Sequence, residues 1–168
     1  MTLSNFSTRT VHGGEPRTKP YHAITTPIVH TSTYPFAKTQ DMVDYMEAHI
    51  WGDETGREEY GRYGNPTVAA AEAKLAELEG GEAACLFSSG MAATSTALLS
   101  LLAAGSHMLM TDDCYRRTRR LVTEFLPRFG IEATVVPVNN YDALEAAIQP
   151  NTKLILSESP TNPYLRVL

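Results

Sequence analysis

Two loops of the sequence combine residues that could bind an anion and a flat ring. The first, "SSGMAA" at residues 88–93, stands between an apolar run and a helical pattern, so the backbone N–H groups of Gly90 and Met91 could approach an anion at a helix start. The second, "TDDCYRRTRR" at residues 111–120, places Tyr115 in the first turn of a helix, where its ring could lie beside that anion. Each loop also has an ordinary structural explanation, because serines cap helices and tyrosines are common on helix surfaces.

Two further loops carry polar groups next to prolines and glycines. In "SESPTNPYLR" at residues 157–166, two prolines restrict the backbone around Asn162, whose amide can both donate and accept hydrogen bonds. In "EYGRYGNPT" at residues 59–67, Arg62 stands between two tyrosines just before a strong helix start, and nothing nearby in the sequence indicates what the arginine contacts. Asn-Pro is also a generic turn, and the arginine-rich segment 116–120 is more typical of a solvated helix face than of a binding site.

The elements that must position these loops alternate in type after residue 64. Asn65 and Pro66 are a favoured N-cap and first helical residue, and the helical apolar pattern that follows ends at the glycine pair 80–81. The predicted strands cover residues 83–87, 107–111, 131–138 and 153–157, and the later helices cover residues 88–104, 114–129 and 141–148. This alternation predicts an α/β fold, with a mainly parallel sheet covered by helices on both faces. Because ligands bind at the carboxyl ends of such strands, the loops there are expected at one edge.

The N-terminal part lacks this regularity. Residues 1–36 are rich in Thr, Pro and His, with short β-prone pieces broken by proline, and they predict an extended arm rather than a packed domain. A short helix is expected over residues 38–50, where apolar residues recur at helical spacing. We therefore expect an arm and connector at residues 1–58, followed by the α/β part at residues 59–168.

Composition and charge argue against several classes of protein. The chain has 168 residues, of which 43% are hydrophobic and 20% charged, as expected of a globular domain. Its net charge of −5 argues against a nucleic-acid partner, and no apolar stretch is long enough to predict a membrane span. Cys85 and Cys114 lack metal-type spacing, so we expect no metal site, a reducing cytoplasm and a core position for Cys85.

Taken together and in this order, the motifs "YGRYGNPT", "SSGMAA", "TDDCYRRTRR" and "ESPTNPYLR" resemble the Cys/Met-metabolism family of pyridoxal-phosphate enzymes. The resemblance extends to "STRTVHGGEP" and "TTPIVHTSTYPF" in the arm, so it covers nearly the whole chain. It implies pyridoxal 5′-phosphate as the cofactor and fold type I. It also implies that residues 59–168 are the first, incomplete part of the large cofactor-binding domain.

The resemblance assigns the binding of phosphate to four residues. Tyr60 and Arg62 match residues that reach the cofactor phosphate of a neighbouring subunit, a role that suits the planar guanidinium group. Gly90 and Met91 match the backbone cradle for the subunit's own phosphate. The family resemblance therefore implies a homo-oligomer, either a dimer with shared active sites or a tetramer.

The remaining implied roles concern the reaction. Tyr115 matches the ring that stacks on the cofactor and takes part in proton transfer, and Asn162 matches the amide that contacts the cofactor's phenolic oxygen and the substrate carboxylate. Within the family the chain resembles plant-type cystathionine γ-synthase, since Arg117 stands where methionine γ-lyases carry a cysteine. The implied reaction is γ-replacement, in which cysteine and an O-acylated homoserine give cystathionine. Cystathionine or methionine β- or γ-lyase and O-acylhomoserine sulfhydrylase are the alternatives within the family.

The family also needs a lysine that forms a Schiff base with the cofactor. None of the four lysines, Lys19, Lys38, Lys74 and Lys153, has a reason to be that residue. The chain is therefore interpreted as the N-terminal portion of a longer enzyme and is expected to be inactive by itself. A hypothesis of another class stays open, namely a truncated, non-catalytic protein that binds phosphate-bearing ligands or pairs with a full-length relative.

Overall fold

The computed structural model of the chain describes residues 5–53 and 55–167. The elements, in chain order, are α1 (Phe6–His12), η1 (Pro20–His22), α2 (Thr39–Trp51), α3 (Pro66–Glu79), α4 (Gly90–Leu101), β1 (His107–Thr111), α5 (Arg116–Arg120), η2 (Leu121–Phe125), η3 (Leu126–Phe129), β2 (Glu132–Val136), α6 (Tyr141–Ala146) and β3 (Thr152–Leu156). They form two compact units, a first unit of Met1–Leu86 and a second unit of Phe87–Leu168. This division does not coincide with the boundary predicted between residues 58 and 59, because α3 packs against α1 of the arm. The functional division into an arm and a cofactor-binding domain stays a prediction. No helix in the described ranges has the length and apolar character that crossing a membrane requires.

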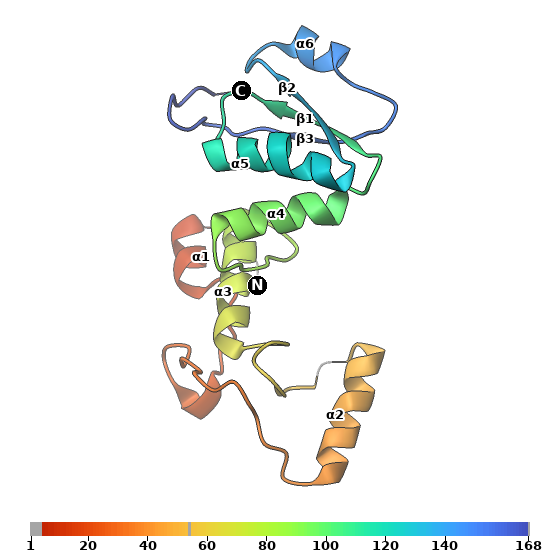
Figure 1. Cartoon of the computed structure of the whole chain (residues 1–168). Coiled ribbons are helices and arrows are strands. Elements are labelled where there is room, and N and C mark those ends of the chain that lie inside the picture. The colour runs from red at the N-terminus through yellow and green to blue at the C-terminus, as the bar shows by residue number, and fades with distance from the viewer. Residues whose placement is uncertain (1–4, 54, 168) are drawn as a thin grey trace. The chain divides into compact units, whose positions relative to one another are not determined.

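The second unit contains the predicted parallel sheet. Its strands lie in the order β2-β1-β3, and both neighbours pair with β1 in parallel. The connection from β1 to β2 and the connection from β2 to β3 run in opposite directions across the sheet. Right-handed crossovers therefore place α5 and α6 on opposite faces, as Figure 1 shows. The predicted α/β class and the three later strands are confirmed.

The core of this unit lies between β1 and the helices on one face. Met108 and Met110 of β1 are fully buried and pack with a cluster that includes Leu98, Val122 and Leu126. Because successive strand residues point to opposite faces, two residues two positions apart share this core. The central strand is buried along its whole length, which fixes the loops that leave its carboxyl end.

The predicted helix 114–129 is present but is not regular. Its α-helical turns end at Arg120, a π turn follows in η2, and a 3₁₀ turn containing Pro127 forms η3. Proline lacks the N–H group that a regular helix requires, so Pro127 cannot continue the regular hydrogen-bond pattern. The change in winding alters which side chains face the core. Phe125 and Phe129 are 43% and 52% exposed, whereas Leu126 is fully buried.

The arm in the first unit is not extended throughout, which corrects the prediction. Residues Phe6–His12 form helix α1, and the side chain of Asn5 accepts the N–H of Ser7 at 2.9 Å as its N-cap. Helix α1 packs against α3, where the Arg9 Nε atom lies 3.1 Å from the Glu77 carboxylate. The arm is therefore docked on a helix rather than free of contacts.

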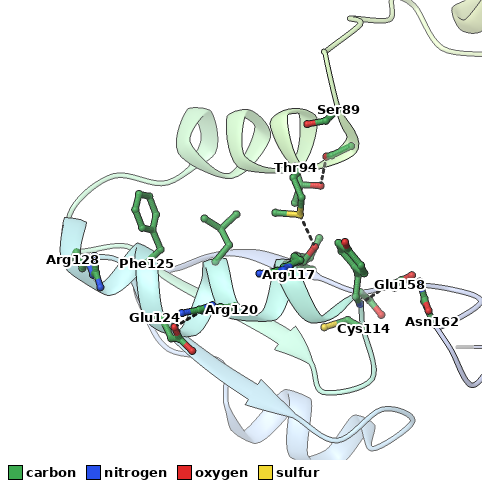
Figure 2. A pocket seen from close by; sticks show the side chains of 17 residues that line it. Ser89, Thr94, Cys114, Arg117, Arg120, Glu124, Phe125, Arg128, Glu158 and Asn162 are labelled. Carbon is green, nitrogen blue, oxygen red and sulfur yellow. Dashed lines mark hydrogen bonds and ion pairs between the residues drawn. The ribbon is translucent and has the colours of Figure 1, made fainter.

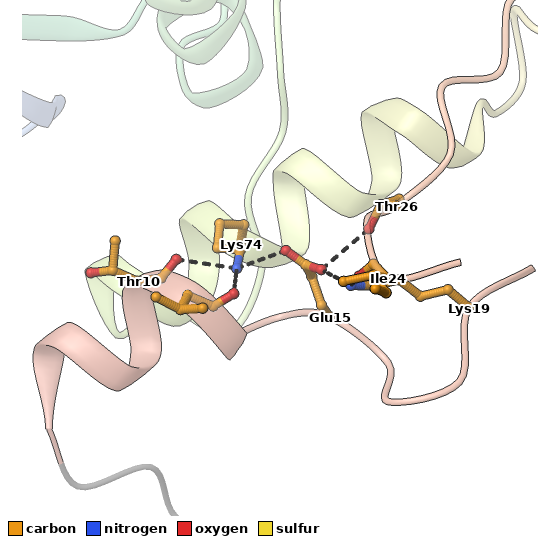
Figure 3. Close-up of polar contacts among 7 residues, drawn as sticks. Thr10, Glu15, Lys19, Ile24, Thr26 and Lys74 are labelled. Atoms are coloured by element: carbon orange, nitrogen blue, oxygen red, sulfur yellow. Dashed lines mark hydrogen bonds and ion pairs between the residues drawn. The ribbon is translucent and has the colours of Figure 1, made fainter. Parts of the chain in front are cut away.

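A cluster of charges fastens the segment after α1 to α3. Lys74 of α3 points its ammonium group to Glu15 at 2.9 Å and to the carbonyl oxygens of Thr10 and Val11 at 3.3 and 3.0 Å, as Figure 3 shows. Lys19 contacts the other oxygen of the same carboxylate at 2.5 Å. The two ammonium groups hold the pKa of Glu15 at about 2, below its usual 4.5.

The later arm pairs with the loop that carries Arg62. Thr33 and Tyr60 form an antiparallel bridge, and the Gly61 N–H donates to the Ser32 carbonyl at 2.7 Å. A Cβ atom at Gly61 would lie 3.3 Å from the Ser32 Cα, so this close approach favours glycine. The extended part of the arm thus determines the backbone position of the "EYGRYGNPT" loop.

Two local predictions are wrong. Residues 83–87 do not form a buried strand: in the described part of the chain they pair with no strand, Cys85 is exposed rather than in the core, and the Leu86 N–H donates to the Glu72 carboxylate at 2.7 Å instead. The predicted helix over residues 38–50 is confirmed as α2; its apolar residues are largely exposed, and its buried residue is Tyr45, in edge contact with Phe36. Burial raises the pKa of the Tyr45 hydroxyl.

Candidate functional site

The second unit has a pocket of about 1170 Å³ at the carboxyl ends of β1 and β3. Figure 2 shows that its wall comes from the start of α4, from the helical run α5–η3 and from the loop after β3. The lining includes Gly90, Met91, Tyr115 and Asn162, four of the six predicted site residues. The expectation that these loops meet at one sheet edge is confirmed for the three loops of this unit.

The start of α4 leaves two backbone donors free. Ser89 caps the helix, since its Oγ accepts the Ala92 N–H at 3.1 Å. Within the described ranges, the N–H groups of Gly90 and Met91 have no hydrogen-bond partner. A Cβ atom at Gly90 would meet nothing within 4 Å, so the space beside Gly90 is open. The serine cap and an anion site are therefore compatible, and the helix dipole favours a negative charge here.

Tyr115 lies directly before α5 rather than in its first turn. Its N–H donates to the Glu158 carboxylate at 2.7 Å, and 45% of the residue is exposed at the pocket. The neighbouring Cys114 also lines the pocket. Burial and then the charge of Glu158 raise the pKa of the Cys114 thiol, so the thiol stays protonated and is a poor nucleophile.

The arginine-rich segment divides between the pocket and the surface. Arg117, Arg120 and Arg128 line the pocket, and Arg117 and Arg120 are also exposed, in agreement with the predicted solvated helix face. Arg120 pairs with Glu124 at 2.7 Å, as Figure 2 shows. In the part of the chain that the structure describes, Arg117 and Arg128 have no carboxylate partner. Glu158 also lines the pocket, so three arginines face two glutamates and the wall carries a net charge of +1.

Sequence reasoning missed the acidic residues that fix these loops. Asp112 and Asp113 look like caps for α5, but Asp112 accepts the Val138 N–H at 2.9 Å and Asp113 accepts the Thr161 hydroxyl at 2.8 Å. Glu158, which holds Tyr115, lies in the "SESP" motif without a local signal for this contact. The partners are 26 to 48 residues apart in sequence, so no local pattern could reveal them.

Tyr60 and Arg62 belong to the first unit, while the pocket wall comes from the second. The Arg62 guanidinium carbon lies 5.2 Å from the Tyr60 ring centroid and 5.3 Å from that of Tyr63. No carboxylate of the described residues pairs with Arg62. The two rings are 6.0 Å apart in an edge arrangement, so they flank the cation without neutralising it.

The fold and the pocket together define an α/β protein with a pocket at the carboxyl ends of parallel strands. Residues 7–168 match the family described as Cys/Met metabolism PLP-dependent enzyme. The chain belongs to this family, and the predicted fold, resemblance and cofactor class are confirmed.

Individual relatives agree with the family assignment. The chain is 44% identical over 167 residues to cystathionine gamma-synthase 1, chloroplastic, of Arabidopsis thaliana, covering 98% of this chain and 29% of that protein. It is 43% identical over 157 residues to cystathionine gamma-lyase of Bacillus subtilis (strain 168), covering 94% and 38%. The crystal structure of cystathionine gamma-lyase from Lactobacillus plantarum complexed with L-serine matches with a TM-score of 0.80 and 39% identity, covering 97% of this chain and 39% of that one. The chain therefore spans well under half the length of these relatives.

Proposed function

We propose that this chain is the N-terminal part of an enzyme that joins cysteine to an O-acylated homoserine and so forms cystathionine. In this γ-replacement the cysteine sulfur bonds to the γ-carbon, the carbon–oxygen bond breaks, and the ester group leaves as its carboxylic acid or, from O-phosphohomoserine, as inorganic phosphate. The observation that carries the proposal is that Gly90, Met91, Tyr115 and Asn162 line one pocket in a member of a pyridoxal-phosphate-dependent family.

The residues of the pocket fit pyridoxal 5′-phosphate. The open space beside Gly90 and the two free N–H groups suit the phosphate, and the exposed Tyr115 ring suits a flat heteroaromatic ring. When bound, this cofactor supplies an electron sink for the carbanions of the reaction. The serine cap keeps α4 formed up to the phosphate-binding turn.

Tyr115 and Asn162 are the residues that we assign to the reacting atoms. The Asn162 amide would donate to the cofactor's phenolic oxygen and to the substrate carboxylate, and so orient both. The Tyr115 hydroxyl would accept or donate a proton at the substrate. Arg117 supports γ-replacement within the family because it puts a cation, rather than the cysteine of methionine γ-lyases, on the pocket wall.

Arg62 and Tyr60 would bind the phosphate held by a neighbouring copy of the protein. The argument rests on the Arg62 guanidinium, which two tyrosine rings flank and which pairs with no carboxylate in the described ranges. A phosphate dianion is a natural partner for such a group. The proposal therefore includes a homo-oligomer, either a dimer with shared sites or a tetramer, in a reducing cytoplasm.

None of the lysines is assigned as the covalent attachment site. Lys19 and Lys74 are held by Glu15, and no lysine of the described chain lines the pocket. The lysine that forms the Schiff base would belong to another part of a longer protein. This agrees with the comparison, since this chain covers 29% and 38% of the lengths of two relatives.

The decisive experiment uses protein expressed from the whole reading frame that contains this chain. Incubation of O-acetyl-, O-succinyl- or O-phosphohomoserine with cysteine should give cystathionine, measured by mass spectrometry. Release of 2-oxobutanoate from cystathionine at a higher rate would instead assign a γ-lyase, and formation of homocysteine from sulfide would assign a sulfhydrylase. Absence of all three reactions in a protein that binds the cofactor would reject the proposal.

Arg62→Ala tests the shared phosphate site in the same protein. It should weaken cofactor retention during dialysis by about tenfold or more, with little change in melting temperature, because it removes a charge-assisted contact from an exposed loop. Arg116→Ala is the matched control, because Arg116 does not line the pocket. Unchanged cofactor affinity in Arg62→Ala would remove this role from the proposal.

A further inference from the structure

We propose that Asp113 and Thr161 form a positioning pair that fixes Asn162 with respect to Tyr115. The inference rests on the proposed function, since it concerns the two residues assigned to the reacting atoms. Neither Asp113 nor Thr161 lines the pocket. Their effect would pass through the loops that carry Tyr115 and Asn162.

The pair joins two loops that leave neighbouring strands. Asp113 follows β1 and Thr161 lies in the loop after β3, 48 residues later in sequence. The Thr161 hydroxyl donates to the Asp113 carboxylate at 2.8 Å. Thr161 is fully buried and Asp113 is only 8% exposed, so solvent does not compete for this hydrogen bond.

Thr161 also closes its own loop. Its Oγ atom accepts the Arg166 N–H at 3.0 Å, its N–H donates to the Arg166 carbonyl at 2.9 Å, and its carbonyl accepts the Leu165 N–H at 2.8 Å. The Thr161 hydroxyl therefore donates to Asp113 in the loop after β1 and accepts from Arg166 in its own loop. Asn162, the next residue, lies inside this closed segment.

Two further contacts tie the same two loops at other points. The Tyr115 N–H donates to Glu158, and the hydroxyls of Thr111 and Ser157 lie 3.2 Å apart. The Asp113–Thr161 contact is the buried one of the three, and its two residues lie two positions from Tyr115 and one position from Asn162. Because hydrogen bonds are directional, a buried polar pair fixes the relative position of two loops more narrowly than apolar contact does.

A buried carboxylate that loses its hydrogen-bond donor destabilises the folded protein, so an apolar side chain cannot take the place of the Thr161 hydroxyl. Valine has nearly the shape of threonine but would leave the Asp113 oxygen without this partner and the Arg166 N–H without its acceptor. Arg166 contributes only a longer contact, with its Nε atom 3.7 Å from the same carboxylate oxygen. We therefore expect the loop to shift when the hydroxyl is removed, and Asn162 to shift with it.

The test compares Thr161→Val, Thr161→Ser and Asn162→Ala in the holoenzyme from the whole reading frame. Thr161→Val should raise KM for the homoserine ester and lower kcat/KM by about tenfold to a hundredfold, the size expected for a misplaced orienting group. It should also change the pH dependence of the visible absorption band of the bound cofactor, and Asn162→Ala should change it in the same way. Thr161→Ser, which keeps the hydroxyl, should restore both properties to within about threefold of the original protein.

Thr123→Val is the matched control, because the hydroxyl of Thr123 is exposed and bonds only within its own helix, to the Arg119 carbonyl. If Thr161→Val is indistinguishable from Thr123→Val while Asn162→Ala is impaired, the positioning pair is rejected and the proposed function stands. If Asn162→Ala is itself without effect, the role of Asn162 is rejected and the positioning pair with it.

Asp113→Asn keeps the test decisive if Thr161→Val does not fold. Asparagine keeps the shape and one acceptor oxygen but removes the charge, so KM should rise several-fold with the cofactor absorption still altered. An unchanged KM and an unchanged absorption profile in a folded Asp113→Asn protein would overturn the proposal.

Discussion

Different interactions stabilise each of the two units of the chain internally. In the described part of the first unit, Tyr45 and Ala76 are the buried apolar residues, whereas the second unit buries side chains from all of β1 and from α4, η2 and η3. The first unit relies instead on directed polar contacts, above all those of Lys74 with Glu15 and with two carbonyl groups. Apolar burial fixes the second unit, and ion pairs and close backbone approach fix the first.

This difference matches the roles that we propose for the two units. The pocket with Tyr115 and Asn162 stands on a buried sheet, which can hold reacting groups within narrow limits. The loop with Arg62 stands on an arm whose contacts are polar and partly exposed. Such contacts weaken with acid and with salt, whereas apolar burial does not. The following predictions test this comparison.

The largest effect is expected in the core of the second unit. Leu126→Ala should lower the free energy of unfolding by about 3 kcal/mol, because Leu126 is fully buried and its truncation leaves a cavity. Urea unfolding measures this change, and hydrogen exchange should show faster exchange in β1 with α1 and α3 unaffected. Phe129→Ala, at a residue that is 52% exposed, is the control and should cost less than about 1 kcal/mol. Equal effects of the two substitutions would contradict the apolar core described for this unit.

A smaller effect is expected where the arm touches α3. Gly14 has a φ of +69°, and a Cβ atom there would lie 2.5 Å from the Ala73 backbone. Gly80 has the same φ of +69° but nothing within 4 Å of such an atom. Gly80→Ala should therefore cost about 1 kcal/mol from backbone strain alone, and Gly14→Ala distinctly more. Hydrogen exchange in α1 and α3 measures the difference. If Gly14→Ala accelerated exchange no more than Gly80→Ala, the close approach of Gly14 to the Ala73 backbone would not be what holds the arm on α3.

The smallest effect is a dependence on pH in the first unit. The pKa of Glu15 is about 2 in the folded chain and near 4.5 when the contact is lost, so the folded state binds the proton less readily. The stabilisation by Glu15 is therefore complete above about pH 4.5 and is lost as the pH falls toward 2. Exchange of the α1 amides should accelerate over this range.

Glu15→Gln is the control for this pH dependence. Glu15→Gln should accelerate amide exchange in α1 at neutral pH and should remove most of the change in exchange rate between pH 4.5 and 2. Core amides of β1 should show no matching change in either protein. An α1 whose protection is the same in Glu15→Gln as in the original chain would show that the charge cluster does not hold the arm.

The sequence by itself determined the elements that depend on neighbouring residues. Asn65 and Pro66 start α3, Ser89 starts α4, and the apolar run 107–111 forms β1, each as predicted. Caps, proline and apolar periodicity act within a few residues, so they can be recognised without a structure. The order of motifs also sufficed to identify the family, because four short patterns together are far more specific than one.

Only the tertiary structure decided which distant groups meet. Thr161 meets Asp113, Tyr115 meets Glu158, and Lys74 meets Glu15, across 43 to 59 residues of sequence. Such pairs leave no local pattern because their spacing depends on how the strands and helices pack. The same reason explains the error at residues 83–87, because this apolar run lacks a partner strand among the described residues. Local propensity selects an element, but pairing and packing decide whether it forms and which side it buries.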